Sequence, residues 1–345
     1  MRITVTERVL HFREPAMTSR GTYTDRRIWI VTVSDGVRQG VGECAPLPDL
    51  SCDYDIYADE PVAAAAYGAR LRQWCDEVEA TGRIDAEAMR PFPSMLFGLE
   101  TALADLEATA QPELTIPING LVWMGNHEEM LRRMEQKLEL GFRCVKLKVG
   151  AIDFDSELDL VKRIRRRFSR QEVELRLDAN GGFRPDEALD RLTLLARYDI
   201  HSIEQPVKAG QWETMAALCR QSPLPIALDE ELIGVNDPEQ KRQLLHTIRP
   251  AYIVLKPSLH GAVSGCREWL SLAREAGIGS WLTSALESNI GLTAIARLAA
   301  EFYGPDIAMP QGLGTGQLFT DNIPMPVEVR GDKLWVGGKN EKMKK

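Results

Sequence analysis

The sequence predicts an α/β protein in which a closed parallel barrel follows a smaller α+β module. The chain has 345 residues, enough for a barrel of about 250 residues and a second domain. After residue 117, short apolar or β-branched runs alternate with amphipathic helical stretches, as in repeated β/α units. Several of these runs end in a lysine or an acidic residue, and the catalytic groups of β/α barrels gather at such strand ends.

The N-terminal part differs from the rest, because strands come first and helices follow. Turn residues at 34–36 separate two of the strands. The expected strands are residues 3–12, 27–34 and 41–45, and the expected helices are residues 62–79 and 93–108. This order is typical of an α+β module. We place the module at residues 1–110 and the barrel at 111–319, and we expect residues 320–338 to return to the module.

The barrel prediction depends on eight strand-like runs with helical stretches between them. These runs are residues 117–123, 143–149, 173–178, 202–204, 225–228, 251–255, 278–282 and 306–309. Helices are expected at 155–168, from Pro185 onward, and at 261–275, before the helix-terminating Gly277. An open doubly wound sheet is the alternative, but no G-x-G-x-x-G or Walker A motif supports it. The charged tail 339–345 is expected to be disordered.

Composition narrows the partners and the compartment. Hydrophobic residues make up 44% and charged residues 27%, which is ordinary for a globular protein, and the net charge of −8 disfavours nucleic acid or an anionic membrane as a partner. No apolar run approaches the roughly 18 residues of a membrane span, and the first residues resemble an alternating strand, not a secretory signal. Six cysteines without a C-x-x-C pair predict reduced thiols and a cytoplasmic location in preference to a disulfide framework.

Charged residues stand at the ends of five consecutive predicted strands. The steps are 30 residues (148 to 178), 26 (178 to 204), 25 (204 to 229) and 27 (229 to 256), each the length of one β/α unit. The residues are Lys146 and Lys148, Asp178, Glu204, Asp229 and Lys256. Alone, such an acid usually caps the next helix, and a single lysine is usually solvated. Together, in this register, they predict one catalytic rim.

The residue types on this rim predict a metal site with flanking proton carriers. Asp178, Glu204 and Asp229 offer hard oxygen ligands for Mg²⁺ or a similar ion, and the absence of His and Cys among them argues against zinc. Lysines close to a metal ion and to one another should lose basicity and carry protons near neutral pH. His260 is expected on the surface, and Glu230 and its neighbour Glu231 either support the ligands or cap a helix.

This set of residues resembles the muconate lactonizing subgroup of the enolase superfamily. The resemblance covers almost the whole chain and implies a (β/α)7β modified TIM barrel with an N-terminal α+β capping domain. Three further motifs look like the o-succinylbenzoate synthase family, namely residues 176–180 (RLDAN), 284–291 (SALESNIG) and 312–319 (GLGTGQLF). Members of that family often have Asp where Gly314 stands here, so the detail of the last loop departs from the pattern.

The resemblance implies a carbon–oxygen lyase of menaquinone biosynthesis. Its small-molecule carboxylate substrate would be 2-succinyl-6-hydroxy-2,4-cyclohexadiene-1-carboxylate (SHCHC), dehydrated to o-succinylbenzoate through an enediolate. Mg²⁺, or Mn²⁺, would sit on Asp178, Glu204 and Asp229. Lys148 would be the base and then the acid, Lys256 would stabilise the intermediate from the opposite face, and Lys146 would hold a nearby positive charge.

The resemblance also suggests the substrate contacts. Asn180, Ser284 and Gly312 are candidates, with Arg176 in support, although Arg176 and Ser284 have local barrel hydrogen bonding as an equal alternative. Cap loops at 17–25, which include Arg20, and at 46–57 are expected over the barrel mouth.

Other activities stay open from sequence. An N-acylamino acid racemase or a dipeptide epimerase of the same superfamily would use the same two lysines, although the epimerases usually carry Asp-x-Asp where residues 312–314 read Gly-Leu-Gly. A mandelate-type enzyme would need a histidine where Ser284 stands. A metal-free Schiff-base barrel that uses Lys256 and a non-catalytic scaffold are the more distant alternatives. The oligomeric state is left open.

Overall fold

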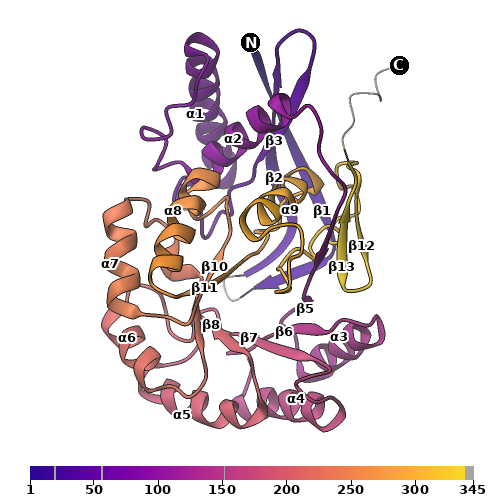
Figure 1. Cartoon of the computed structure of the whole chain (residues 1–345), viewed down its shortest axis with the longest axis vertical. Helices are drawn as coiled ribbons and strands as arrows, with labels where there is room; N and C mark the ends of the chain where they lie inside the picture. The colour runs from indigo at the N-terminus through magenta and orange to yellow at the C-terminus, as the bar shows by residue number, and fades with distance from the viewer. Residues whose placement is uncertain (19–20, 56, 151, 339–345) are drawn as a thin grey trace.

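The computed structural model describes residues 1–18, 21–55, 57–150 and 152–338, so Arg20 and the tail 339–345 lie outside the described residues. An antiparallel sheet opens the chain, and two helices pack on it (Figure 1). The sheet consists of β1 (Arg2–Thr18), β2 (Gly21–Ser34) and β3 (Gln39–Cys44); the helices are α1 (Glu60–Thr81) and α2 (Pro93–Glu107). This is the α+β capping domain that was predicted.

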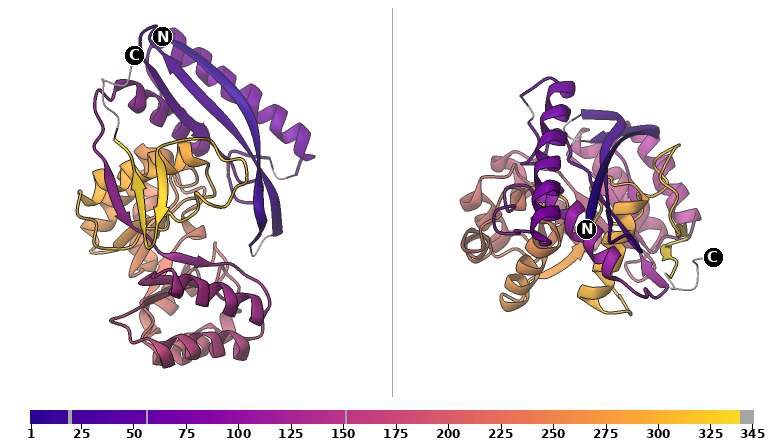
Figure 2. Two further views of the ribbon diagram at one scale, coloured as in Figure 1. Left: turned by 90° about the vertical axis from the view of Figure 1, so that its right-hand side faces the viewer. Right: turned by 90° about the horizontal axis from the view of Figure 1, so that it is seen from above.

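Two features of this cap bear on the site. Residues 17–25, predicted as a loop, belong mostly to a hairpin, in which Met17 pairs with Thr22 and Thr18 pairs with Gly21. This hairpin extends from the cap along one side of the barrel domain (Figure 2). Helix α2 approaches β3 closely, since a Cβ atom on Gly42 would lie 1.9 Å from the carbonyl oxygen of Gly98.

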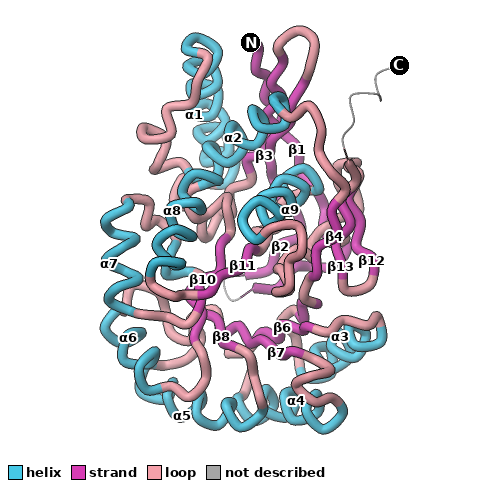
Figure 3. The backbone as a smooth tube through the Cα atoms, viewed as in Figure 1, coloured by secondary structure: helices cyan, strands magenta, loops and turns pink. Residues whose placement is uncertain are grey.

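Seven parallel strands in sequence order form the wall of the barrel. They are β5 (Gly120–Val122), β6 (Cys144–Lys148), β7 (Glu174–Asp178), β8 (Ser202–Glu204), β9 (Ile226–Leu228), β10 (Tyr252–Leu255) and β11 (Gly279–Leu282). The intervening helices lie outside the strands (Figure 3). They are α3 (His127–Glu139), α4 (Phe154–Arg167), α5 (Pro185–Leu195), α6 (Trp212–Gln221), α7 (Pro238–Ile248), α8 (Ala262–Glu275) and α9 (Asn289–Tyr303).

The eighth strand is short and lies later than predicted. Residues 306–309 form no strand; instead Gln311 bridges to Ile118 and Gly312 bridges to Thr283, both in parallel. The prediction followed the apolar run 307–309, but the backbone reaches β11 only after Pro310, which has no N–H to donate. These bridges close the ring, so the predicted (β/α)7β barrel is confirmed.

After the barrel, the chain passes the cap, and residues 327–336 then pair with a strand that precedes the barrel strand β5. Asp321 accepts a hydrogen bond from the backbone of His11 in β1 at 2.8 Å. Strands β12 (Val327–Arg330) and β13 (Lys333–Val336) then form a sheet with β4 (Leu114–Pro117), not with β1–β3. The domain limits near residues 110 and 319 stay a prediction.

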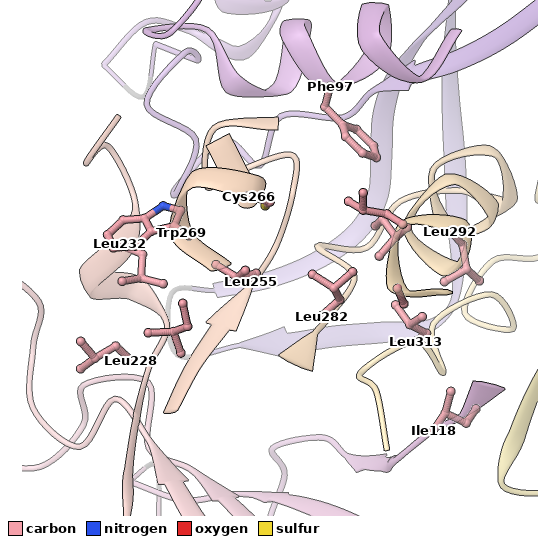
Figure 4. Packing of buried hydrophobic residues seen from close by; sticks show 14 of the residues in the cluster. Phe97, Ile118, Leu228, Leu232, Leu255, Cys266, Trp269, Leu282, Leu292 and Leu313 are labelled. Atoms are coloured by element: carbon pink, nitrogen blue, oxygen red, sulfur yellow. The ribbon is translucent and has the colours of Figure 1, made fainter. Parts of the chain in front are cut away.

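One apolar core joins the two domains. Phe97 of α2 belongs to the same buried cluster as Leu282 of β11 and Leu292 of α9 (Figure 4). Helix α2 also packs against α8. The shared core therefore seats the cap on the last two β/α units of the barrel. Within the described residues, no helix has the length and apolar character that a membrane span requires.

Candidate active site and metal centre

The six predicted rim residues meet at the carboxyl ends of the barrel strands. Lys148 is paired in register with Asp178, and Asp178 with Glu204, so parallel pairing sets their side chains at one level. Asp229 and Lys256 directly follow β9 and β10. We call Lys146, Lys148, Lys256, Asp178, Glu204 and Asp229 the mouth cluster.

The three carboxylates of the mouth cluster are suited to a cation. One oxygen from each of Asp178, Glu204 and Asp229 lies within 4.8 Å of the others, and all three side chains are fully buried. Oε1 of Glu204 and Oδ1 of Asp229 have no hydrogen-bond partner. Buried oxygens without a donor are costly unless a ligand satisfies them, and carboxylate oxygens are the ligands of hard divalent cations. The donor set therefore fits the predicted metal.

The lysines approach these carboxylates from two sides. Nζ of Lys146 lies 2.8 Å from both Asp178 and Glu204, and Nζ of Lys148 lies 2.6 Å from Asp178. Nζ of Lys256 contacts Asp229. Strands β6 and β10 are four positions apart in the ring of eight, so Lys148 and Lys256 come from opposite walls. This is the arrangement that the sequence predicted for them.

The proximity of so many charges shifts their protonation equilibria. Burial raises the pKa of Glu204 to about 7; Lys146 attracts its charged form, while Asp178 and Asp229 repel it. Burial opposes the charge of Lys146, but its carboxylate neighbours prevail and raise its pKa above the ordinary value. The pKa of Lys256 is raised in the same way by Asp229. The loss of lysine basicity that the sequence predicts requires a bound cation and stays a prediction; the carboxylates around Lys146 and Lys256 act in the opposite direction.

Several neutral and acidic groups hold the rim in place. His260, predicted on the surface, is fully buried: Lys256 donates its backbone N–H to Nδ1 at 2.9 Å, and burial lowers the pKa of the ring to about 3. Oε1 of Glu230 accepts a hydrogen bond from Asn180 at 2.8 Å. Glu231 accepts one at 2.9 Å from Gln205, whose own side-chain oxygen receives the backbone N–H of Asp229. Sequence reasoning missed Gln205, although it directly follows Glu204.

The predicted substrate-binding residues divide into two groups. Asn180, Ser284 and Gly312 line a cavity of about 100 Å³ above the lysines. Arg176 does not reach it; its guanidinium bonds to Glu174 and to the carbonyl of Pro310, and it stacks 4.5 Å from the Trp281 ring. Glu174 is the first residue of β7 and Pro310 precedes the eighth strand, so Arg176 supports the barrel interior below the site.

The cavity has walls from both domains. Leu47 and Leu50 enter from the predicted cap loop 46–57, and Leu121, Trp123 and Leu286 complete the apolar lining. A Cβ atom on Gly312 would lie 2.1 Å from Oγ1 of Thr283, so only glycine permits the eighth strand to approach β11 here.

A second cavity of about 340 Å³ adjoins the first. The two share Asn119, Leu121, Trp123, Gly314 and Thr315 in their linings. Oγ1 of Thr315 is buried and has no hydrogen-bond partner. The basic residues of the second cavity are Arg13, Arg133 and Lys137.

Comparison with known proteins places this geometry in a family. Residues 129–334 match the model of the enolase C-terminal domain-like family, and residues 11–106 match that of the MenC N-terminal domain. The o-succinylbenzoate synthase of Desulfotalea psychrophila is 44% identical, over 95% of this chain and 96% of the relative. The chain belongs to the o-succinylbenzoate synthase family. The crystal structure of MenC from the same organism has a TM-score of 0.78 and 39% identity, and covers 97% of this chain and 99% of that one.

Other members of the enolase superfamily share the fold at lower identity. A dipeptide epimerase from Enterococcus faecalis, complexed with Mg and L-Leu-L-Tyr, has a TM-score of 0.81 at 20% identity, covering 97% of this chain and 96% of that one. Backbone similarity is thus as high for an epimerase as for the synthase family. The family assignment depends on sequence identity over the full length, while these distant structures show the fold alone.

Proposed function

We propose that this protein dehydrates 2-succinyl-6-hydroxy-2,4-cyclohexadiene-1-carboxylate (SHCHC) to o-succinylbenzoate in menaquinone biosynthesis. The observation that carries the proposal is the 44% identity to an o-succinylbenzoate synthase over 95% of the chain. The mouth cluster supports it, because its residue types and positions suit proton removal next to a carboxylate. In the reaction a C–H bond and the C–O bond to the hydroxyl break, a C=C bond forms, and water leaves.

We assign the metal site to Asp178, Glu204 and Asp229. Mg²⁺ is the expected ion, with Mn²⁺ as the substitute, because all three ligands are carboxylates and two of their buried oxygens lack a donor. The bound cation would bind the ring carboxylate of the substrate and stabilise the negative charge that develops there.

The three lysines of the mouth cluster would have different roles in the reaction. Lys148 would take the proton from the ring carbon that carries the carboxylate, and would then give it to the departing hydroxyl. Nζ of Lys148 lies 2.7 Å from Oδ1 of Asn180, and the amide of Asn180 donates in turn to Glu230. These bonds define the position of the Lys148 ammonium group. Lys256, from the opposite wall, would stabilise the negative charge, and Lys146 would contribute a fixed positive charge nearby.

The cavities support a substrate with two carboxylates. Ligand pockets for small molecules usually have about 300 to 1,000 Å³, so the cavity of about 100 Å³ alone suits only part of SHCHC. The second cavity extends it and contains Arg13, Arg133 and Lys137. Within the described chain, no carboxylate pairs with the ammonium of Lys137, which lies over the Phe142 ring. We assign the ring and the contacts to Asn180, Ser284 and Gly312 to the first cavity, and the succinyl arm to the second.

The test is a spectroscopic assay of the purified full-length protein with SHCHC. We expect the diene absorbance to disappear with added Mg²⁺, to persist after EDTA treatment, and to disappear again when Mg²⁺ is returned. Absence of SHCHC turnover in folded, Mg²⁺-loaded protein would contradict the proposal.

A racemase of N-acylamino acids is the second candidate. Two lysines on opposite walls also suit removal of a proton from one face and its return to the other. Exchange of the α-proton in deuterium oxide, measured with N-succinylamino acids and with dipeptides, distinguishes this activity. We expect kcat/KM for SHCHC to exceed that for either of these substrates.

A further inference from the structure

One buried arginine of the cap bonds to two neighbouring loops that both line the cavity. Arg26 in β2 is 3% exposed, and its guanidinium donates to the carbonyls of Ala45 and Pro46 at the start of the cap loop. It also donates to the carbonyls of Ala285 and Leu286 after β11, each at 3.3 Å. The cap loop carries Leu47 and Leu50, and the barrel loop carries Ser284 and Leu286, into the cavity.

The barrel loop has a shape that needs such support. Leu286 has φ of +66°, a left-handed conformation that is unfavourable for a residue with a side chain. The fully buried carboxylate of Glu287 accepts bonds at 2.6 Å from the hydroxyl of Ser284 and the backbone N–H of Ala285. Its other oxygen accepts the hydroxyl of Ser258 at 2.6 Å. The loop is therefore held from the barrel side by one carboxylate and from the cap side by Arg26.

A second cap residue fixes the helix that follows this loop. Glu43 of β3 is fully buried and accepts the backbone N–H groups of Ser288 and Gly291, both at 2.8 Å, at the start of α9. Burial lowers the pKa of Arg26, while Glu287 and then Glu43 attract its charge and oppose that effect. The guanidinium thus has four backbone carbonyls as direct acceptors, and the two buried carboxylates favour its charge.

We propose that Arg26 is a positioning residue that fixes the cap loop and the barrel loop relative to each other, and thereby the shape of the substrate cavity. This inference rests on the proposed function. A planar guanidinium can direct donors to both loops at once, whereas a lysine ammonium is a single point on a flexible stem. Loss of Arg26 would weaken the contacts of the substrate with Leu47, Ser284 and Leu286. The hydrogen bonds within the mouth cluster would be unchanged.

The test compares Arg26→Lys with Arg27→Lys. Arg27 is the next residue of the same strand, is 29% exposed, and pairs with Glu7 and Glu60 away from the cavity. We expect KM for SHCHC to rise about tenfold in Arg26→Lys with kcat changed by less than about threefold, and both constants to stay within about twofold in Arg27→Lys. Hydrogen exchange of the amides at 284–288 should accelerate in Arg26→Lys alone.

Two results would overturn the inference. One is an unchanged KM in folded Arg26→Lys, which would leave the arginine a purely structural role even if the thermal midpoint fell. The other is unchanged exchange at 284–288, a measurement that needs no substrate and so stays decisive if the wild type does not turn over SHCHC. Where Arg26→Lys is not recovered folded, Arg26→Gln replaces it under the same criteria.

Discussion

Two clusters of basic and carboxylate groups in this protein have different surroundings. The mouth cluster lies at the strand ends beneath a cavity. The second, which we call the seam cluster, consists of Arg90, Lys241 and Glu268, where the cap meets α7 and α8. Both bring ammonium groups within 2.8 Å of carboxylate oxygens. Residue type and proximity alone therefore do not distinguish a site from a structural contact.

The difference lies in how the carboxylate oxygens are satisfied. Oε1 of Glu268 accepts from Arg90, and Oε2 accepts from both Arg90 and Lys241. Lys241 is fully buried, also donates to the carbonyl of Gly265, and lies 5.4 Å from the Trp269 ring. In the mouth cluster, by contrast, oxygens of Glu204 and Asp229 lack donors. Unsatisfied acceptors beside a cavity indicate a ligand, and satisfied acceptors between packed helices indicate stability.

The largest effect should follow removal of Lys148. We expect Lys148→Ala to lower kcat/KM for SHCHC about 1,000-fold or more, because no other lysine among the described residues bonds to Asn180. Circular dichroism should show an intact fold. Turnover near that of the wild type would remove Lys148 from its proposed role.

The next largest effect should appear in metal binding. We expect Asp178→Asn to weaken Mn²⁺ affinity at least about tenfold, because it removes one of the three proposed anionic ligands. Titration calorimetry without substrate measures this directly. Glu268→Gln in the seam cluster is the matched control and should leave the affinity unchanged; equal weakening by both changes would erase the distinction between the clusters.

Loss of the seam lysine should affect stability and spare catalysis. We expect Lys241→Met to lower the free energy of unfolding by roughly 1 to 3 kcal/mol, because the carbonyl of Gly265 loses a donor and Glu268 keeps only Arg90. Urea denaturation tests this, with kcat/KM expected to stay within about twofold. Arg242→Met is the control, since that side chain is 58% exposed and should cost less than about 0.5 kcal/mol.

The smallest effect is a pH dependence of the seam cluster. Burial opposes the ionisation of Glu268, but hydrogen bonds from Arg90 and Lys241 prevail and hold its pKa below the ordinary 4.5. A depressed carboxylate pKa stabilises the fold above the ordinary value, and this contribution disappears as pH falls through the folded value. The stability difference between wild type and Glu268→Gln should therefore shrink below about pH 4.5 in urea titrations. For the exposed Glu213→Gln, a similar shrinkage would contradict the assignment.

Tertiary structure corrected the predictions for His260 and the eighth strand, and it decided between the two alternatives that the sequence left open for Arg176. His260 follows Lys256 by four residues, and nothing in its neighbours in sequence indicates that the ring turns inward to accept the Lys256 backbone N–H. The alternation of side chains along a strand predicts that Arg176 points into the barrel. It does not indicate which end of the barrel such a long side chain reaches. The eighth strand was misplaced because its apolar run precedes the two residues that pair.

By itself, the sequence determined the barrel and the mouth cluster, because one β/α unit is a local repeat and parallel pairing returns each strand end to the same rim. Only the tertiary structure decided how the cap meets that rim. Glu43 bonds to Ser288 across 245 residues, and Arg26 bonds to Leu286 across 260. Such long-range hydrogen bonds form because polar groups are buried at the surface that the two domains share. No periodicity in the sequence predicts them.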